Sequence, residues 1–315
     1  MDLSGEGFEG LKMVGVFPLG NTRPNSCRAG MQLLVGFKRA FFKMFGRFSS
    51  KILNKIKYRR LTPSNHKLED IYLVSFPKSG NTWLRFLVAN AFKQHLQIQQ
   101  EVNFFSIHDI IPDVQISRNI RDVGIFGQSD LPRIIKSHSR FNPNYHRVIL
   151  LVRDPRDALV SYYYFLRNYG GLPEEYKISE FIRSDRFGAD VWSLHTQSWL
   201  SRASSNQNVQ VILYEDLVAS TAEVLSRVVE MIGFNVCSKD LSFAVELSSK
   251  EAMKRSEEKH RSYLAVNSQT TPFVRESKSL RRVELSSEDR SFIEARTRSA
   301  ARLVGYDFTG ANKSL

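Results

Sequence analysis

The 315-residue chain is long enough for one large α/β domain or two small ones, and its composition is ordinary for a globular protein. Two cysteines, Cys27 and Cys237, exclude a disulfide framework and a cysteine-ligated metal cluster and favour a reducing compartment. The net charge of +13 is uneven, because 13 of the 45 Lys and Arg residues lie within residues 10–67, which contain no acid. The remaining chain is nearly neutral, so the charge does not indicate a nucleic-acid partner.

Residues 1–67 are predicted to form a basic N-terminal extension that contains an amphipathic helix at 33–56. Apolar residues recur there at steps of three or four: Leu34, Phe37, Phe41, Phe45, Phe48, Ile52 and Ile56. A Phe-rich basic helix is typical of peripheral contact with an anionic membrane or another polyanion. Packing of the apolar face on the rest of the protein is the first alternative. A transit peptide is the second, although the acidic opening of the chain counts against it.

The elements that follow alternate between strands and helices, which predicts an α/β fold. Short apolar runs predict strands at 71–76, 132–136, 147–152 and 209–213. Periodic segments predict helices at 81–95, 155–169, 190–204, 221–232 and 287–304, and 254–282 is predicted to be a long loop. We therefore expect a single P-loop-like domain over 68–308, with a mostly parallel central sheet flanked by helices and a tail at 309–315. Ligands of such sheets lie beyond the carboxyl ends of the strands.

The first such end carries the sequence PKSGNTW at residues 77–83. Small residues, Ser79 and Gly80, let backbone N–H groups approach an anion, and Lys78 adds a mobile positive charge. Asn81 and Thr82 fall where the next helix begins, so the amides at this helix terminus also favour an anion. Trp83 offers a flat face for a base. The stretch predicts a phosphate-binding loop, although the usual G-x-x-x-x-G-K-[ST] pattern is missing.

Three more strand ends carry polar residues that one site could collect. Lys136 and His138 follow the second predicted strand. Arg153 follows the third, with Ser161 eight residues later in the next helix. Tyr214 follows the fourth strand.

Together these stretches resemble the cytosolic type of sulfotransferase, which uses 3′-phosphoadenosine 5′-phosphosulfate (PAPS) and releases PAP. The resemblance runs from about residue 71 to residue 306. It implies that the loop Pro77–Trp83 grips the 5′-phosphosulfate, with Lys78 near the bridging oxygen. It also implies that His138, in the Lys-x-His stretch with Lys136, is the general base. From the chemistry of the site we expect Lys136 to assist at the sulfonate oxygens.

The same resemblance implies that Arg153 and Ser161 bind the 3′-phosphate, and that Trp83 and Tyr214 contact the adenine. The stretch around Trp192 and Trp199 also resembles a family segment, and we expect it to be structural.

Two departures from the family pattern bear on the site. Asn81 replaces the first of two consecutive Thr residues, and we expect its side-chain amide to donate to the donor nucleotide in place of the hydroxyl. The late phosphate-binding signature is eroded to FVRESKSLRR, in which Arg275 is the best match to the family arginine. Lys278, Arg281 and Arg282 are open alternatives to Arg275.

The expected chemistry is sulfuryl transfer to a hydroxyl without a metal ion. A histidine, with an ordinary pKa near 6.5, suits proton abstraction from a hydroxyl at neutral pH. The acceptor itself, whether lipid, phenol, sterol or glycan, is not identified by the sequence. Its pocket is expected in the loops 99–131 and 254–282, lined by aromatic residues such as Phe104, Phe105, Tyr163 and Tyr263. We expect a cytoplasmic enzyme, with membrane association through 33–56 as an added hypothesis.

Two other functions fit parts of the sequence. A P-loop nucleotide kinase would use Asp154 as its metal-binding acid, but the first loop lacks the Gly-Lys-Ser/Thr that presents a Mg²⁺ ligand. A non-catalytic protein that binds membranes or polyanions on the same fold is the second alternative. The presence of Lys78, His138, Arg153 and Ser161 argues against it.

Overall fold

The computed structural model describes residues 61–117, 119–120, 131–168, 171–202, 208–259 and 285–308. The predicted helix at 33–56 and Arg275, with its three alternatives, lie outside the described residues. Membrane contact through 33–56 therefore stays a prediction, which co-sedimentation of the full chain with anionic vesicles at low and high salt would test.

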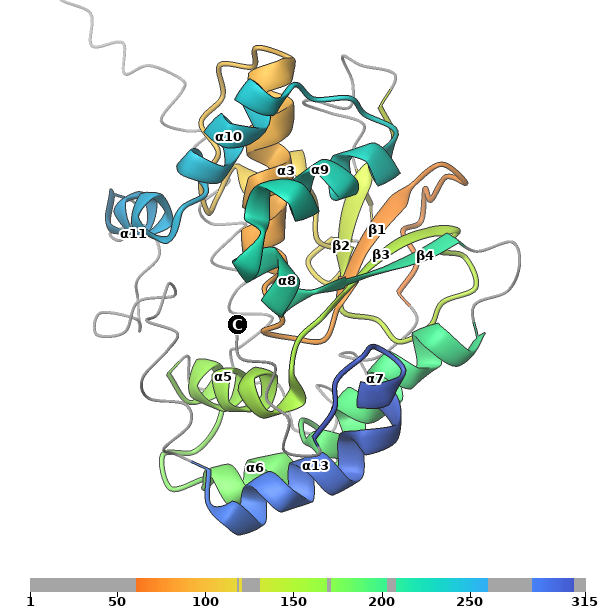
Figure 1. The fold of residues 1–315 in the computed structure, drawn as a ribbon, viewed down its shortest axis with the longest axis vertical. Coiled ribbons are helices and arrows are strands. Elements are labelled where there is room, and N and C mark those ends of the chain that lie inside the picture. Colours follow the sequence, from red (N-terminus) through yellow and green to blue (C-terminus); the bar gives the residue numbers. More distant parts are fainter. Residues whose placement is uncertain are drawn as a thin grey trace, which may run out of the picture. The chain divides into compact units, whose positions relative to one another are not determined.

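The centre of the fold is a sheet of four parallel strands in the order β2-β1-β3-β4 (Figure 1). The strands are β1 (Ile71–Ser75), β2 (Ile134–Ser137), β3 (Arg147–Val152) and β4 (Asn208–Leu213). All four were predicted to within about two residues at each end. Because the strands are parallel, their carboxyl ends meet at one edge, and the four predicted groups of site residues meet there too.

All five predicted helices are present, together with shorter ones that the sequence pattern did not indicate. The predicted ones are α3 (Asn81–His95), α5 (Pro155–Asn168), α7 (Ala189–Arg202), α9 (Thr221–Ile232) and α13 (Ser287–Arg302). The added ones are α4 (Ile107–Ile110), α6 (Ile178–Arg183), α8 (Tyr214–Ala219), α10 (Ser238–Leu247) and α11 (Lys250–Lys259). The prediction of a loop from 254 is wrong as far as 259, where α11 ends. None of the described helices is both long enough and apolar enough to cross a membrane.

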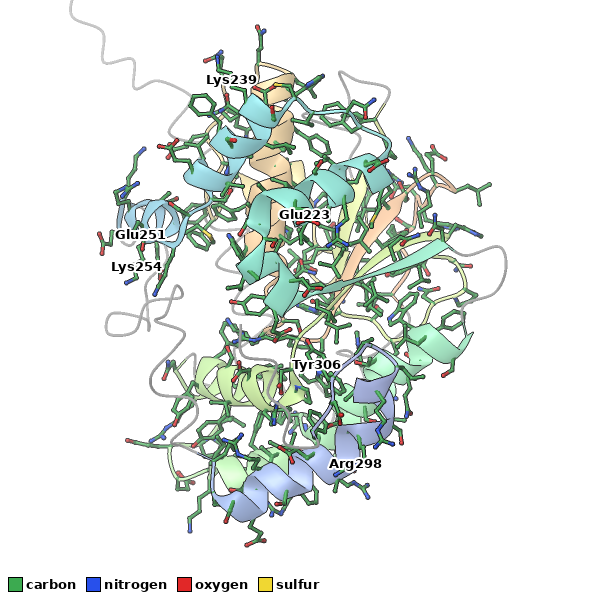
Figure 2. All side chains as sticks on the ribbon, viewed as in Figure 1. Glu223, Lys239, Glu251, Lys254, Arg298 and Tyr306 are labelled. Atoms are coloured by element: carbon green, nitrogen blue, oxygen red, sulfur yellow. The ribbon has the colours of Figure 1, made fainter. Side chains whose placement is uncertain are left out.

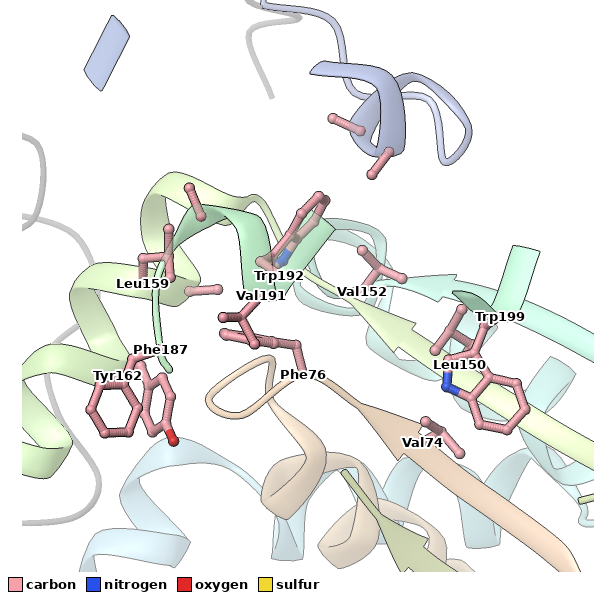
Figure 3. Close-up of a cluster of buried hydrophobic side chains, with 14 of the residues drawn as sticks. Val74, Phe76, Leu150, Val152, Leu159, Tyr162, Phe187, Val191, Trp192 and Trp199 are labelled. Atoms are coloured by element: carbon pink, nitrogen blue, oxygen red, sulfur yellow. The ribbon is translucent and has the colours of Figure 1, made fainter. Parts of the chain in front are cut away.

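The sheet separates two hydrophobic cores, which lie on its opposite faces. Alternate residues of each strand point to opposite faces, so Tyr72 and Val74 join one core while Ile71 and Leu73 join the other. Helices α5, α6, α7 and α13 cover the first face, and α3, α9 and α10 cover the second. Figure 3 shows part of the first core. Trp192 and Trp199 are fully buried there, which agrees with their expected structural role.

Residues 61–67, which the sequence places in the extension, pack on the domain. Leu61 belongs to the first core, and its carbonyl accepts a hydrogen bond from the Tyr145 hydroxyl. Asn142 and Asn144 both donate to the Thr62 hydroxyl, at 3.0 and 3.2 Å. The folded unit therefore begins at or before Leu61, seven residues earlier than predicted.

Candidate active site

The loop between β1 and α3 has the backbone geometry of an anion-binding loop. Lys78 and Gly80 both have positive φ, 66° and 95°, and the Ser79 N–H donates to the Phe76 carbonyl at 3.3 Å. Helix α3 starts at Asn81, and its first intrahelical bond runs from the Leu84 N–H to the Gly80 carbonyl at 3.1 Å. The N–H groups of residues 81–83 consequently have no acceptor within the helix. They face the end of β1 and are positioned to bind an anion.

Gly80 is required at its position by both its backbone and its neighbour. A Cβ atom there would lie 2.5 Å from Cδ2 and 2.7 Å from Cε2 of Tyr214, closer than two carbon atoms can approach. Its φ of 95° is also one that residues with a side chain rarely adopt. The Tyr214 ring thus packs directly on the backbone of the loop.

Gly80→Ala should therefore displace Tyr214 and weaken nucleotide binding by about tenfold or more. Gly233→Ala is a matched control, since Gly233 has a similar φ of 88° but nothing within 4 Å of an added Cβ. The control should lose only about 1–2 kcal/mol of stability from the backbone conformation and should bind nucleotide normally. Calorimetric titration of both variants with PAP, alongside their melting temperatures, checks this. If Gly80→Ala lost no more affinity for PAP than Gly233→Ala, Tyr214 would not form part of the nucleotide site.

The side chain of Asn81 does not do what the sequence predicted. Its amide nitrogen donates to the Leu73 carbonyl at 3.1 Å and to the Ser75 hydroxyl at 3.2 Å. Asn81 is buried, and these two bonds tie the start of α3 back to β1. Its Oδ1 has no hydrogen-bond partner among the described residues, and its backbone N–H is positioned to bind a ligand. Thr82, the next residue, is partly exposed.

Arg153 connects three parts of the site as the chain leaves β3. Its guanidinium donates to the Lys78 carbonyl at 3.2 Å and lies 4.3 Å from the centroid of the Tyr214 ring. It also approaches the Asp157 carboxylate at 3.6 Å. The residue is 95% buried, and its Nε makes no hydrogen bond to the part of the chain that the structure describes. A buried donor without an acceptor is costly, and an anionic ligand would satisfy it.

Ser161 lies on the face of α5 that borders this loop. Asp157, Ser161 and Phe165 are spaced four residues apart and share one helix face. Arg153 contacts Asp157 at one end of this row, and the Lys78 ammonium lies 4.5 Å from the centroid of the Phe165 ring at the other. Ser161 is between them, so the structure brings Lys78, Arg153 and Ser161 to one place.

The two aromatic residues predicted to contact a base are close together. The rings of Trp83 and Tyr214 meet edge to face, with 6.1 Å between their centroids. The Trp83 indole N–H donates to the Ser248 carbonyl at 2.9 Å, and the Asn90 amide donates to the Ser248 hydroxyl at 2.9 Å. Ser248 therefore fixes Trp83 from the end of α10.

Glu215, the residue after Tyr214, anchors the start of α8 by two hydrogen bonds. Tyr214 is the first residue of α8, and Glu215 accepts hydrogen bonds from the Asp154 N–H and the Tyr306 hydroxyl. Tyr306, labelled in Figure 2, follows α13. The C-terminal helix is thereby linked to the nucleotide side of the site.

His138 has the tautomer that a general base needs. Its Nδ1 lies 2.7 Å from the Ser75 carbonyl, so Nδ1 carries the hydrogen and Nε2 keeps its lone pair. Burial lowers the pKa of His138 well below its ordinary value of 6.5, and the Lys136 charge acts in the same direction. The imidazole is therefore neutral at pH 7 and can accept a proton at Nε2.

Lys136 forms a buried ion pair that the sequence analysis missed. Its ammonium contacts the Asp113 carboxylate at 2.5 Å, and both side chains are largely buried. Burial lowers the pKa of Lys136, and Asp113 opposes that shift. Burial alone would raise the pKa of Asp113, but the positive charges around it, above all that of Lys136, hold it well below its usual range. The Asp113 carboxylate is therefore ionised at neutral pH.

Arg85 is a second buried charge near this pair. Its guanidinium donates to the carbonyls of Ile107 and Ile111, which holds the segment that leads to Asp113. Burial lowers the pKa of Arg85 to about 10. The only sequence signals were a charged residue between Leu84 and Phe86 on a helix and an acid in an apolar run. Neither signal indicates which partner the charge will find.

The structure also places two further histidines and two aromatic residues. Burial lowers the pKa of both His108 and His195 to about 3, so both are neutral, which agrees with a structural role. Tyr163, expected in the acceptor pocket, is instead buried in the first core and donates to the Tyr176 carbonyl at 2.8 Å. Phe104 packs on Phe86, with 5.0 Å between the ring centroids.

The residues present fit an adenine nucleotide with phosphate groups. Besides Arg153 Nε, the buried Ser79 hydroxyl makes no hydrogen bond to any described residue, and it belongs to the anion-binding loop. Asp154, the acid that a kinase would need, is already used: it caps α5 through the Arg156 N–H at 2.8 Å and pairs with the Arg156 guanidinium at 2.6 Å. Within the described residues, no group of three His, Cys, Asp or Glu residues could hold a metal.

Comparison with known proteins agrees with this site. A sequence profile described as the sulfotransferase domain matches residues 68–300. The 3-alpha-hydroxysteroid sulfotransferase of Cavia porcellus is 28% identical over 221 residues, which cover 67% of this chain and 73% of that protein. The fold matches retinol dehydratase, solved with androsterone and PAP, with a TM-score of 0.58 at 18% identity over 79% of this chain and 85% of the other. It also matches mouse sulfotransferase SULT7A1, solved with PAP, with a TM-score of 0.55 at 18% identity over 78% of this chain and 90% of the other. The profile covers most of the chain, which therefore belongs to the PAPS-dependent sulfotransferase family that its motifs predicted.

Proposed function

We propose that this enzyme transfers the sulfuryl group of PAPS to a hydroxyl group, with His138 as the general base. The observation that carries the proposal is the position of His138: its Nδ1 donates to Ser75, the last residue of the strand that leads into the anion-binding loop. A neutral imidazole with a free Nε2 is thus fixed beside the place where phosphate groups would bind. His138 removes the proton of the acceptor hydroxyl as its oxygen attacks.

The nucleotide would be held by residues that follow three of the four strands, β1, β3 and β4. The backbone N–H groups of residues 81–83 and the Lys78 ammonium bind the 5′ end, and Arg153 with Ser161 binds the 3′-phosphate. Trp83 and Tyr214 contact the adenine. PAPS supplies a sulfuryl group whose bond to a phosphate oxygen breaks as its bond to the acceptor oxygen forms.

Lys78 and the helix terminus stabilise the negative charge that appears on the departing phosphate. Their contribution is electrostatic and preorganised, because the loop has its shape fixed by Gly80, Tyr214 and Arg153. Arg275, Lys278, Arg281 and Arg282 remain alternatives for a further contact to the 3′-phosphate.

The acceptor that we propose to test first is a hydroxylated lipid of the steroid class. The relative from Cavia porcellus is a hydroxysteroid sulfotransferase, and retinol dehydratase was solved with androsterone. These two proteins support a class of acceptor, and their identities of 28% and 18% are too low to indicate a particular compound.

A transfer assay with labelled PAPS tests the proposal. The purified full chain is incubated with matched panels of steroid alcohols, phenols, fatty alcohols and saccharides, and products are identified by mass spectrometry. We expect sulfate esters on hydroxyl groups of the steroid panel. A phenol or saccharide product would correct the acceptor class, whereas phosphorylation of acceptors with ATP would contradict the sulfotransferase assignment itself.

A further inference from the structure

The ion pair between Asp113 and Lys136 lies beside His138. Asp113 is not part of any of the sequence motifs described above. The segment around Asp113 runs along the outer edge of β2: the Lys136 N–H donates to the Pro112 carbonyl at 2.7 Å, and the Val114 N–H donates to the Lys136 carbonyl at 3.1 Å. Asp113 and Lys136 are therefore partners in an isolated parallel bridge, and their side chains meet in an ion pair. The carboxylate is 96% buried.

Asp113 is also connected to His138 through the backbone. In the orientation that satisfies both of its polar atoms, the Gln115 amide donates to Asp113 Oδ1 at 2.6 Å and accepts the His138 N–H at 2.9 Å. The Gln115 N–H donates to the same Oδ1 at 2.9 Å. One carboxylate oxygen thus holds the Gln115 link to His138, while the other contacts the Lys136 ammonium.

The charges around His138 show why this carboxylate matters for the reaction. Among the described residues, the titratable groups that interact with His138 or Asp113 are Lys136 on β2, Arg85 on α3, His108 on α4, His195 on α7 and Tyr145 before β3. Asp113 is the acid among these groups, and the other charges are positive. When His138 accepts a proton it becomes a third positive charge in a buried cluster. Without Asp113 no negative charge among these groups would oppose it.

We propose that Asp113 is a positioning residue for sulfuryl transfer, whose carboxylate orients the Lys136 ammonium and compensates the positive charge that His138 acquires from the acceptor hydroxyl. The proton moves from the hydroxyl oxygen to His138 Nε2, and Asp113 keeps its own charge throughout. The inference rests on the proposed role of His138.

The proposal is tested by the titration of His138 in two variants, which should shift in opposite directions. A purely structural role of Asp113 would not produce these shifts. In Asp113→Asn the titration of His138, followed by NMR of the imidazole in the full chain without nucleotide, should move to lower pH by about one unit or more. In Lys136→Met it should move to higher pH. The double variant removes both charges and should return the titration toward that of the wild type. His138→Gln identifies the His138 signal among the seven histidines.

The enzymatic activity of Asp113→Asn should change for the same electrostatic reason. For Asp113→Asn we expect kcat to fall on the order of 10- to 100-fold. The acidic limb of the kcat/KM profile should move to lower pH, because a base with a lower pKa stays neutral further into the acid range. PAP affinity should stay normal, since Asp113 contacts neither the loop nor Arg153. If Asp113→Asn unfolds because Lys136 is left unpaired, the double variant and Lys136→Met still give the NMR comparison.

The outcomes separate this inference from the proposed function. If His138→Ala is inactive but neither Asp113→Asn nor Lys136→Met moves the His138 titration or the pH profile, Asp113 is only a structural residue. If His138→Ala remains active, the proposed base is wrong and the role of Asp113 falls with it.

Discussion

His138→Ala will lose turnover by at least about 100-fold while its affinity for PAP stays close to that of the wild type. The imidazole is bound to β1 through the Ser75 carbonyl, and in the proposed mechanism its Nε2 accepts the acceptor proton, so we expect it to affect proton removal and not nucleotide binding. Steady-state kcat with the best acceptor and calorimetric titration with PAP measure the two quantities separately.

His66→Ala is the control, because His66 is exposed and outside the site. It should leave both kcat and PAP affinity unchanged. A His138→Ala enzyme with nearly normal kcat would require another base, and Lys136 would be the first candidate. A loss of PAP affinity as large as the loss of kcat would mean that His138 supports the nucleotide site instead.

The pH dependence of the wild type follows from the same residue. Burial and the Lys136 charge place the folded-state pKa of His138 well below 6.5, and the base must be neutral to act. The kcat/KM value should therefore stay level as pH falls through 6.5 and decrease only at lower pH.

Arg153→Ala will lose about 10- to 100-fold in affinity for PAP, with little change in affinity for AMP. AMP lacks the 3′-phosphate, and a hydrogen bond between two charged groups contributes about 1.5–3 kcal/mol. The buried Arg153 guanidinium lies near Ser161, its Nε has no acceptor among the described residues, and it contacts Lys78, Asp157 and Tyr214. Calorimetric titrations of wild type and variant with both nucleotides measure the difference.

Arg167→Ala at the other end of α5 is the matched control, since it also removes an arginine but from an exposed position. It should bind both nucleotides as the wild type does. If Arg153→Ala weakened PAP and AMP equally, the arginine would support the loop through the Lys78 carbonyl and would not select the 3′-phosphate.

The elements that carry the site were predictable because their signals are local. Each strand is a short apolar run, and Asp154 before Pro155 is a helix-capping pattern that the structure contains. The helices that the sequence did not indicate, such as α4 and α8, have four and six residues, too few for a periodic pattern. Leu61 was assigned to the extension because nothing in its neighbours shows that it packs against Tyr145, 84 residues away.

The site was predictable where a residue follows a strand end, as Lys136, His138 and Arg153 do. Its electrostatics were not, because an ion pair depends on tertiary contact: Asp113 lies 23 residues from Lys136 in the chain. The Asn81 amide was expected to donate to a ligand and instead donates to the Leu73 carbonyl in β1. The sequence does not show whether a side chain at a helix start donates to a ligand or to the preceding strand. Tyr163 was expected in a pocket because its burial in the core is not visible in the sequence.

We propose that this site moves a sulfuryl group from PAPS to a hydroxyl, with His138 as the base. A single-turnover reaction of the full chain with PAPS and the best acceptor, quenched over time and analysed by mass spectrometry, tests it most directly. We expect PAP and the sulfate ester to appear together in equal amounts, and we expect His138→Ala to bind PAPS but to form neither product. Formation of PAP without the ester, or equal ester formation by His138→Ala, would contradict it.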